Sequence, residues 1–170
     1  MQILPSLVTG GVERGAIDVT QALTAAGWRA IVVSSGGPMM HEVERAGGLH
    51  IQFPAESKNP ITAYRNISRL VALVKEHKVD ILHARSRVPA WSALRAARKT
   101  GVKFITTFHG NYNAGNPLKK FYNSVMARGD LVIAISQFIG DQVCDRYGVP
   151  AEKVRIVPRG ADIKFFDPAA

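Results

Sequence analysis

The sequence has almost no cysteine, because Cys144 is the one thiol among 170 residues. Intrachain disulfides are therefore excluded, and a chain of this length can bury a hydrophobic core without them. Cys144 lies in a helical pattern, where a lone thiol is usually a small buried side chain rather than a nucleophile. The low cysteine content favours a reducing compartment.

Long hydrophobic runs are also missing. No apolar stretch approaches the roughly 18 residues that a membrane span needs. The first residues lack the charged and apolar regions of a signal peptide. We therefore expect a soluble, cytoplasmic protein.

Charge of one sign is absent from a third of the chain. No acidic residue occurs between Asp80 and Asp130. Nine basic residues lie there and account for the whole net charge of +9: Arg85, Arg87, Arg95, Arg98, Lys99, Lys103, Lys119, Lys120 and Arg128. Such a segment favours an anionic partner, such as a phosphate, a phosphorylated glycolipid, a membrane surface or nucleic acid. Nucleic acid is disfavoured, because no aromatic residues alternate with the bases and no nucleic-acid motif is found. A solvated face without a partner is the alternative.

Several catalytic patterns are absent as well. The five histidines have no cysteine or carboxylate partners at metal-ligand spacing, so no metal is expected. The paired carboxylates of a hydrolase are not found. Residues 9–15 have the wrong spacing for the G-x-G-x-x-G fingerprint, which disfavours a nicotinamide or flavin enzyme. No cofactor is therefore expected.

The sequence does contain a regular alternation of β-branched apolar runs with segments of helical period. Several runs are continuous, as in strands that are buried on both faces. Predicted strands cover residues 2–7, 30–35, 50–53, 79–84, 102–108, 130–135 and 154–158. The repeated strand–helix–strand order predicts right-handed crossovers. The expected fold class is α/β, with a Rossmann-like, doubly wound parallel sheet and helices on both faces.

Two of the predicted helices have an apolar stripe that should face the sheet. In the first, which Gly27 is placed to end, the stripe consists of Val12, Ala16, Val19, Leu23 and Ala26. In residues 61–78 it consists of Ile61, Tyr64, Ile67, Val71 and Val74. A third helix begins after Ser136 as its N-cap and ends at Gly148 and Pro150.

Gly10 and Gly11 stand between the first strand and the first helix. In such folds ligands bind outside the carboxyl ends of the strands, and the first turn presents helix N-terminal amides to an anion. The pair would let a diphosphate approach the backbone, and the dipole of a helix beginning at Val12 or Glu13 would favour it. A pair required only for turn geometry is the alternative.

Polar residues stand at the ends of three other predicted strands, namely His83, Arg85, Ser86 and Arg87, then His109 and Gly110, then Ser136. Gly110 leaves the His109 imidazole at an open loop, which favours contact with a ligand. The alternative to a site role for Ser136 is that it only caps a helix. Because these strand ends face the Gly-Gly turn, they predict one site that binds a phosphate or an acceptor.

Taken together, these segments resemble the retaining glycosyltransferases of family four, which have the GT-B fold. The resemblance rests on "LPSLVTGGVERGAIDVTQAL", "ILHARSRVPAWSAL", "TTFHGNYN", "VIAISQFI" and "KVRIVPRGADIKFF". It is greatest to bacterial members that build lipopolysaccharide core or other surface saccharides. It implies transfer of a sugar, with retention, from a nucleotide-sugar donor to a glycolipid or saccharide acceptor, without a bound metal.

The resemblance also implies roles for individual residues. Gly10 and Gly11 would approach the donor diphosphate, and His109 would be the catalytic residue that contacts the donor. Residues 1–158 correspond to the N-terminal, acceptor-side domain and 159–170 to the start of an interdomain linker. The C-terminal donor-binding domain is absent from this chain, so the chain alone is expected to be inactive. Arg159 replaces an asparagine of many relatives and receives no catalytic role.

The acid-free segment predicts a cationic face. We expect it to hold the enzyme peripherally on the inner face of the cytoplasmic membrane, with Lys119 and Lys120 facing anionic lipid. The alternative to an enzyme is a non-catalytic α/β module that binds phosphorylated ligands or nucleic acid through the same segment.

Overall fold

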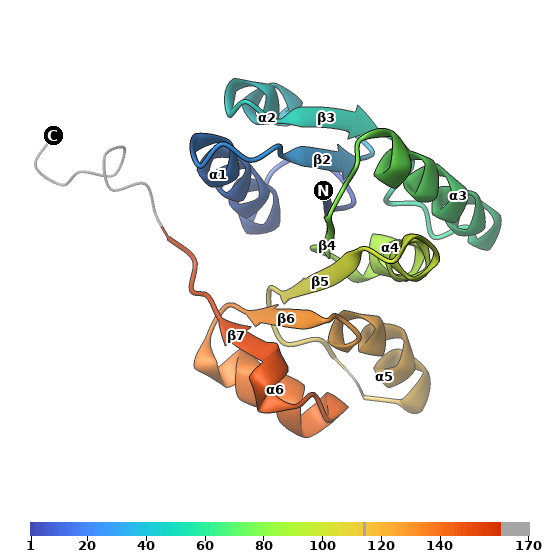
Figure 1. The fold of residues 1–170 in the computed structure, drawn as a ribbon. Coiled ribbons are helices and arrows are strands. Elements are labelled where there is room, and N and C mark those ends of the chain that lie inside the picture. The colour runs from blue at the N-terminus through green and yellow to red at the C-terminus, as the bar shows by residue number, and fades with distance from the viewer. Residues whose placement is uncertain (114, 161–170) are drawn as a thin grey trace, which may run out of the picture.

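A computed structural model describes residues 1–113 and 115–160. In this part of the chain seven parallel strands form one sheet in the order β3-β2-β1-β4-β5-β6-β7 (Figure 1). The strands are β1 Gln2–Ile3, β2 Ile31–Ser34, β3 Leu49–Gln52, β4 Ile81–Ala84, β5 Lys103–Phe108, β6 Leu131–Ala134 and β7 Val154–Ile156. All seven predicted strands are present, six of them within two residues of the predicted bounds. The exception is β1, which ends early because Pro5 lacks the N–H that a ladder needs.

Helices cover both faces of the sheet, and β2 shows how the faces divide. Val32 packs in a cluster with α1 and α2, whereas Ile31 and Val33 pack on the other face in a larger cluster with α3, α4 and α6. The helices are α1 Gly11–Ala25, α2 Met40–Arg45, α3 Pro60–Glu76, α4 Arg87–Thr100, α5 Pro117–Asn123, η1 Ser124–Ala127, α6 Gln137–Tyr147 and η2 Ala151–Lys153. The predicted Rossmann-like, doubly wound sheet is therefore confirmed.

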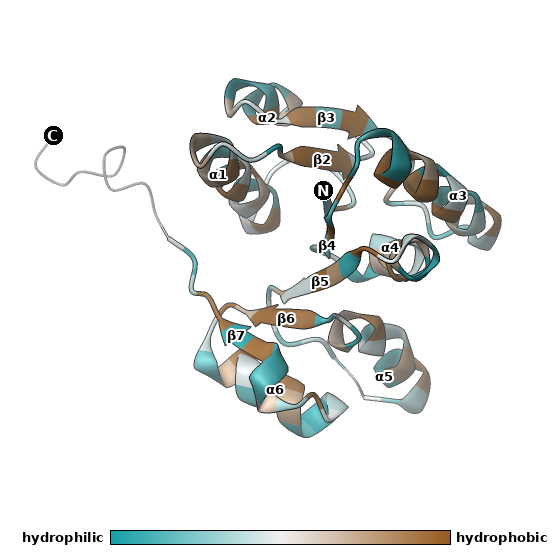
Figure 2. Cartoon of the chain, in the orientation of Figure 1, coloured by the Kyte–Doolittle hydropathy of each residue, from teal (hydrophilic) through white to brown (hydrophobic). Residues whose placement is uncertain are grey.

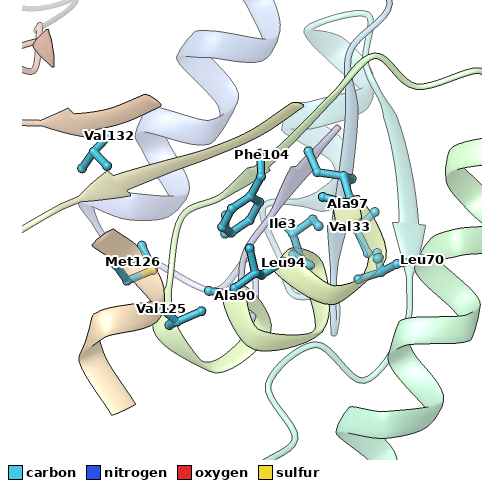
Figure 3. Packing of buried hydrophobic residues seen from close by; sticks show 14 of the residues in the cluster. Ile3, Val33, Leu70, Ala90, Leu94, Ala97, Phe104, Val125, Met126 and Val132 are labelled. Atoms are coloured by element: carbon cyan, nitrogen blue, oxygen red, sulfur yellow. The ribbon is translucent and has the colours of Figure 1, made fainter. Parts of the chain in front are cut away.

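The larger core lies between the sheet and the layer of α3, α4 and η1 (Figure 3). Phe104 of β5, Leu94 of α4 and Met126 of η1 are at most 4% exposed there. Colouring by hydropathy shows β2 and β6 as largely hydrophobic (Figure 2). This agrees with strands that are covered on both faces.

The predicted buried stripes of two helices are partly wrong. In α1 the buried residues are Ala16, Ile17 and Thr20, whereas Ala26, just after the helix, is exposed. Thr20 is buried because its hydroxyl donates to the Ala16 carbonyl at 2.8 Å, which satisfies its polar group.

In α3 the buried face is rotated toward the helix positions that precede the predicted Ile67 and Val71. It consists of Asn66, Ile67, Leu70 and Val74, while Ile61 and Tyr64 are 63% and 68% exposed. Asn66 takes an inward position because its Nδ2 donates to the Pro54 carbonyl at 2.8 Å. Ile61 and Tyr64, at the start of α3, therefore face the solvent and not the sheet.

The α1 side of the sheet is covered unevenly. Its buried cluster lies over β2 and the residues that follow β1. Over β4, β5 and β6 the same side carries the half-buried Ile81, Ile105 and Ile133, which line an apolar cavity of about 600 Å³ together with Val19 and Leu23 of α1. Among the described residues, no helix has both the length and the apolar character that crossing a bilayer would need.

Candidate functional site

The polar site lies where the strand order reverses, between β1 and β4. At this point of an open parallel sheet, ligands bind outside the carboxyl ends of the strands. A cavity of about 330 Å³ is bounded there by the first turns of α1, the ends of β4, β5 and β6, and the segment after β7. Its polar lining comprises Arg14, Asp18, His83, Arg85, Thr107, His109 and Arg159.

Gly10 and Gly11 form the start of α1 beside this cavity. Gly10 is the N-cap with a φ of 137°, a conformation that favours glycine. Gly11 is the first helical residue, so the helix begins one residue earlier than predicted. A Cβ on Gly11 would overlap the guanidinium of Arg159. Gly10 thus serves the turn, and Gly11 serves the close approach of a group to the helix.

Arg85 is a buried cation that directly follows β4 and packs against the first turns of α1. Its residue is 5% exposed, and its Nη1 donates to Gln2 Oε1 at 2.9 Å. The missing side chain of Gly15 makes room for the guanidinium, since a Cβ there would stand 2.8 Å from Arg85 Nη2. Burial, and then the nearby Arg159, lower the pKa of Arg85 to about 10. The site therefore holds a desolvated positive charge.

His109 faces the same cavity from the end of β5. Arg159 Nη2 donates to His109 Nδ1 at 2.8 Å. Because a guanidinium has donors only, Nδ1 is the acceptor and the proton of the neutral imidazole is on Nε2. Burial, then Arg85 and Arg159, lower the pKa of His109 to about 3. At neutral pH the imidazole is thus a neutral donor through Nε2, and Nε2 is buried without a partner among residues 1–113 and 115–160.

His83 and Thr107 complete the floor of the cavity. His83 Nε2 and Thr107 Oγ1 are 2.7 Å apart. Burial, followed by the charge of Arg85, holds the pKa of His83 well below its usual range. Both histidines of the site are therefore uncharged at neutral pH.

Acidification is expected to destabilise the chain. Below about pH 6.5 the unfolded chain binds protons at these histidines, whereas the folded state takes up the His109 proton only near pH 3. The free energy of unfolding should therefore fall from pH 7 toward pH 4, by at most about 1.4 kcal/mol per pH unit for each histidine. Urea unfolding at constant ionic strength measures the slope. His109→Gln should reduce it and the exposed His41→Gln should keep it, so equal slopes in these two variants would contradict the assignment.

The remaining predicted site residues are not brought to the cavity. Arg87 turns toward α5, where its Nη1 donates to Asn123 Oδ1 at 2.9 Å. Ser136 is the N-cap of α6, and its Oγ accepts from the Ile139 N–H at 3.3 Å, as the alternative reading of this residue required. Ser86 is the N-cap of α4, and Gly110 lines a separate small hollow. Lys119 and Lys120 are exposed on α5.

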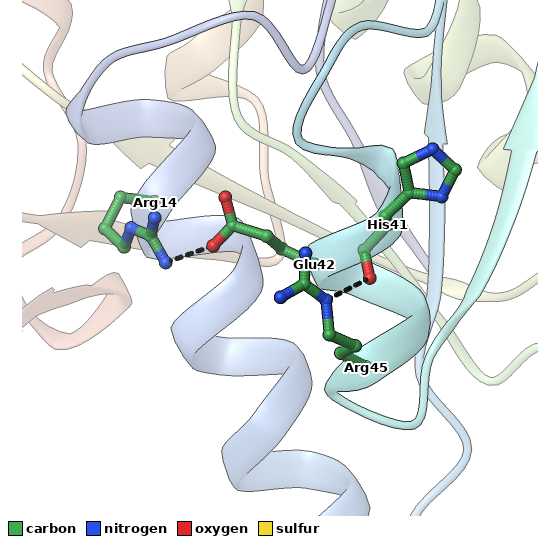
Figure 4. A network of polar contacts seen from close by, with 4 residues as sticks. All are labelled: Arg14, His41, Glu42 and Arg45. Atoms are coloured by element: carbon green, nitrogen blue, oxygen red, sulfur yellow. Dashed lines mark hydrogen bonds and ion pairs between the residues drawn. The ribbon is translucent and has the colours of Figure 1, made fainter.

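Sequence reasoning missed several contributors to the site, among them Gln2, Gly15 and Arg14. Gln2 anchors Arg85 and is itself held by donating to the Ala16 carbonyl at 2.9 Å and to Thr20 Oγ1 at 3.0 Å. Gly15 gives Arg85 its space, and a glycine inside a helix, one turn after Gly11, was the available signal. Arg14 lines the cavity, with Nη1 2.7 Å from Glu42 Oε2 of α2 (Figure 4).

The expected linker, residues 159–170, lies outside the described residues apart from Arg159 and Gly160. In the described part of the chain, no group of three histidine, cysteine, aspartate or glutamate residues is placed to hold a metal ion.

Several solved structures have a fold similar to that of this chain over nearly its whole length. A glycosyltransferase from Rickettsia africae ESF-5 is 42% identical, with a TM-score of 0.85 over 99% of this chain and 44% of that one. Anabaena Alr3699/HepE, solved with UDP and glucose, is 18% identical, with a TM-score of 0.79 over 99% of this chain and 46% of that one. The lipopolysaccharide outer core galactosyltransferase WaaB is 16% identical, with a TM-score of 0.69 over 96% of this chain and 47% of that one.

This chain therefore spans less than half the length of these structures. No curated protein matches the sequence. The family description Glycosyltransferase Family 4 matches residues 9–165, which is nearly the whole chain. The resemblance in the sequence motifs is thereby confirmed, and the chain belongs to Glycosyltransferase Family 4.

Proposed function

We propose that this chain is the N-terminal, acceptor-side domain of an enzyme that moves a sugar from a nucleotide-sugar donor to a glycolipid or saccharide acceptor. The transfer proceeds with retention and serves lipopolysaccharide or surface polysaccharide synthesis in a bacterium. One observation carries the proposal. The cavity at the reversal of strand order combines a glycine-opened helix start with the buried donors of Arg85 and His109.

The chemistry of sugar transfer fits such a cavity. When the bond to the anomeric carbon breaks, the leaving diphosphate gains negative charge, which donors fixed in advance stabilise best. The α1 dipole and the Arg85 guanidinium supply positive potential, and the neutral His109 Nε2–H supplies a hydrogen bond. The structure of Alr3699/HepE with UDP-glucose and the name of WaaB motivate the proposed donor and acceptor classes.

The proposal is tested by measuring sugar transfer by two proteins. One is the 170-residue chain alone, and the other is this chain joined to a C-terminal donor domain. The joined protein should transfer sugar from a nucleotide-sugar donor to a lipid-linked saccharide. The 170-residue chain should show no transfer above a no-protein control, because it forms one wall of the cleft and positioning requires both. Transfer by the chain alone, or none by the joined protein with any nucleotide-sugar, would contradict the proposal and favour a non-catalytic module.

We also propose that the layer of α3, α4 and α5 rests on an anionic membrane surface on the cytoplasmic side. Residues 57–75 and 81–129 contain no acidic residue, and they include nearly all of these three helices. The helices lie together on one side of the sheet (Figure 1). Lys119 and Lys120 stand there between two exposed apolar side chains, since Leu118 and Phe121 are 81% and 61% exposed. Large apolar side chains beside bases suit a lipid interface.

Binding to vesicles checks this surface. The chain should sediment with vesicles of anionic lipid at low salt and much less with neutral ones, because each base near the surface contributes about 1 kcal/mol. Salt should weaken binding by screening. Lys119→Glu with Lys120→Glu should reduce it, whereas the matched reversal Arg45→Glu with Lys153→Glu, on α2 and η2, should do so less. An equal loss of binding in both double variants would mean that binding depends on net charge and not on this surface.

A further inference from the structure

Arg146 is a cation that neutral groups hold in one orientation. It lies in the last turn of α6, where its Nη1 donates to Asn111 Oδ1 at 2.9 Å and to the Tyr112 carbonyl at 3.0 Å. The ion pairs of the described residues do not include it. A guanidinium has five N–H donors, and among the described contacts Nε and Nη2 of Arg146 have no partner. These two atoms form a fork that matches two oxygens of a carboxylate or a phosphate.

The loop that Arg146 contacts, residues 111–113, is also tied from the opposite side. Asn123 of α5 is 1% exposed, and its Nδ2 donates to the Asn113 carbonyl at 3.0 Å. Its Oδ1 accepts from Arg87 Nη1 of α4 at 2.9 Å, and the Arg87 guanidinium lies 4.3 Å from the centre of the Tyr112 ring. Three helices therefore fix this loop. Groups that are fixed before a ligand arrives lose little freedom when they bind it.

An open, polar hollow of about 610 Å³ lies beside the loop. Its lining consists of Asn111, Tyr112, Asn113, Gly115, Lys120 and Arg146. A second hollow of about 560 Å³ shares Lys120 and Arg146 with the first. Among the described residues, no carboxylate lines either hollow. Two cations and the asparagine side chains thus border a space to which the described residues contribute no negative charge.

This hollow is close to the polar cavity at the strand ends. Asn111 is two residues after His109, and two residues span at most about 7 Å. A saccharide whose reacting hydroxyl lies in the polar cavity can therefore extend a neighbouring part into the hollow. Asparagine amides suit sugar hydroxyls, because they both donate and accept hydrogen bonds.

We propose that Arg146 and Lys120 form an acceptor subsite for an anionic group on the saccharide. The proposal rests on the proposed function, since it takes the ligand to be the acceptor, and it makes that acceptor a charged one. The anionic group is either the carboxylate of an acidic sugar or a phosphate ester. The test measures binding to the 170-residue chain without a donor. A failure of sugar transfer and a failure of this subsite are therefore separate results.

The NMR signal of the Arg146 Nε–H tests the subsite in the wild type, at constant ionic strength. It should shift on addition of glucuronate or glucose 6-phosphate and stay in place with glucose, because only the first two supply anionic oxygens for the fork. The anion that causes the larger shift identifies the source of the charge. No shift with either anion, or an equal shift with glucose, would overturn the proposal.

Lys120→Met and Lys119→Met form a matched pair. Both lysines are exposed on α5, and each substitution removes one charge, but Lys120 lines both hollows and Lys119 lines neither. Lys120→Met should weaken binding of the anionic sugar about three-fold, whereas Lys119→Met should keep the wild-type affinity. The sugars are soluble and no vesicles are present, so the proposed membrane surface does not contribute. Equal affinities of the two variants would contradict a subsite at the hollow.

Substitutions of Arg146 separate the fork from the charge. Arg146→Lys keeps the charge without the fork and should weaken binding at least ten-fold, and Arg146→Met should abolish it. The signal of the Asn113 side-chain amide reports binding in these variants, and thermal unfolding checks that they fold. If Arg146 only ties the loop to α6, Arg146→Lys will have a lower Tm and wild-type affinity. That result would reject the subsite.

Discussion

Replacing His109 with alanine should lower kcat/KM of the complete enzyme about ten-fold to a thousand-fold, which corresponds to roughly 1.4 to 4 kcal/mol of transition-state stabilisation. The imidazole is neutral, with its proton on Nε2, and this N–H has no partner within the described part of the chain. Alanine removes the donor and leaves the backbone of β5 unchanged. Steady-state kinetics measures the loss, and the melting temperature checks the fold.

Two further substitutions separate the donor from the volume of the ring. Gln can place an amide N–H near the position of Nε2, whereas Asn reaches only the position of Nδ1. His109→Gln should therefore recover part of the activity and His109→Asn should not. Equal activity of these two variants, or full activity of His109→Ala, would show that the Nε2–H makes no contact in the transition state.

Gly37→Ala should cost about 3 kcal/mol or more of the free energy of unfolding, because two effects add. Gly37 has a φ of 141°, which L-residues rarely adopt. A Cβ there would also lie 2.5 Å from the carbonyl carbon of Leu7. That backbone is fixed, since the Leu7 N–H donates to the Gly36 carbonyl at 2.8 Å and the Met39 N–H donates to the Leu7 carbonyl at 2.9 Å.

Gly110→Ala is the matched control. Apart from its two chain neighbours, no atom of the residues that the structure describes lies within 4 Å of a Cβ at Gly110, and its φ is outside the left-handed region. Its effect should stay within about 0.5 kcal/mol. Chemical denaturation of both variants gives the comparison, and similar midpoints for the two would mean that the loop carrying Gly37 can shift away from Leu7.

The order of the elements could be predicted from the sequence because strands such as β2 and β6 are nearly continuous apolar runs that no helix period explains. The buried faces of α1 and α3 were harder to predict. Ile61 and Tyr64 fit the helical period, yet these two residues are exposed and Asn66 is buried instead. The choice between two neighbouring stripes depends on which polar side chain finds a partner in another segment. No local pattern records that partner.

For the site, the sequence predicted the edge of the sheet where it lies but only some of its residues. Arg85 and His109 were named because carboxyl ends of parallel strands meet at one edge. Arg87 was named for the same reason, but it belongs to α4 and turns toward α5. Gln2 was not named, because its role depends on the guanidinium that another strand brings beside it. Position along a strand thus predicts the edge of the sheet, but not which side chains meet there.

The reversal of strand order also bears on how the chain folds. Most neighbouring strands are consecutive in the sequence, but β1 pairs with β4, and the hydrogen bond from Arg85 to Gln2 joins residues 83 positions apart. Closing so long a loop is slow relative to local pairing, so β1–β3 and β4–β7 should assemble as two halves that join last. Gly11 and Gly15 belong to the first half, Arg85 and His109 to the second. A ligand that contacts both halves would slow their separation and hence the unfolding of the chain.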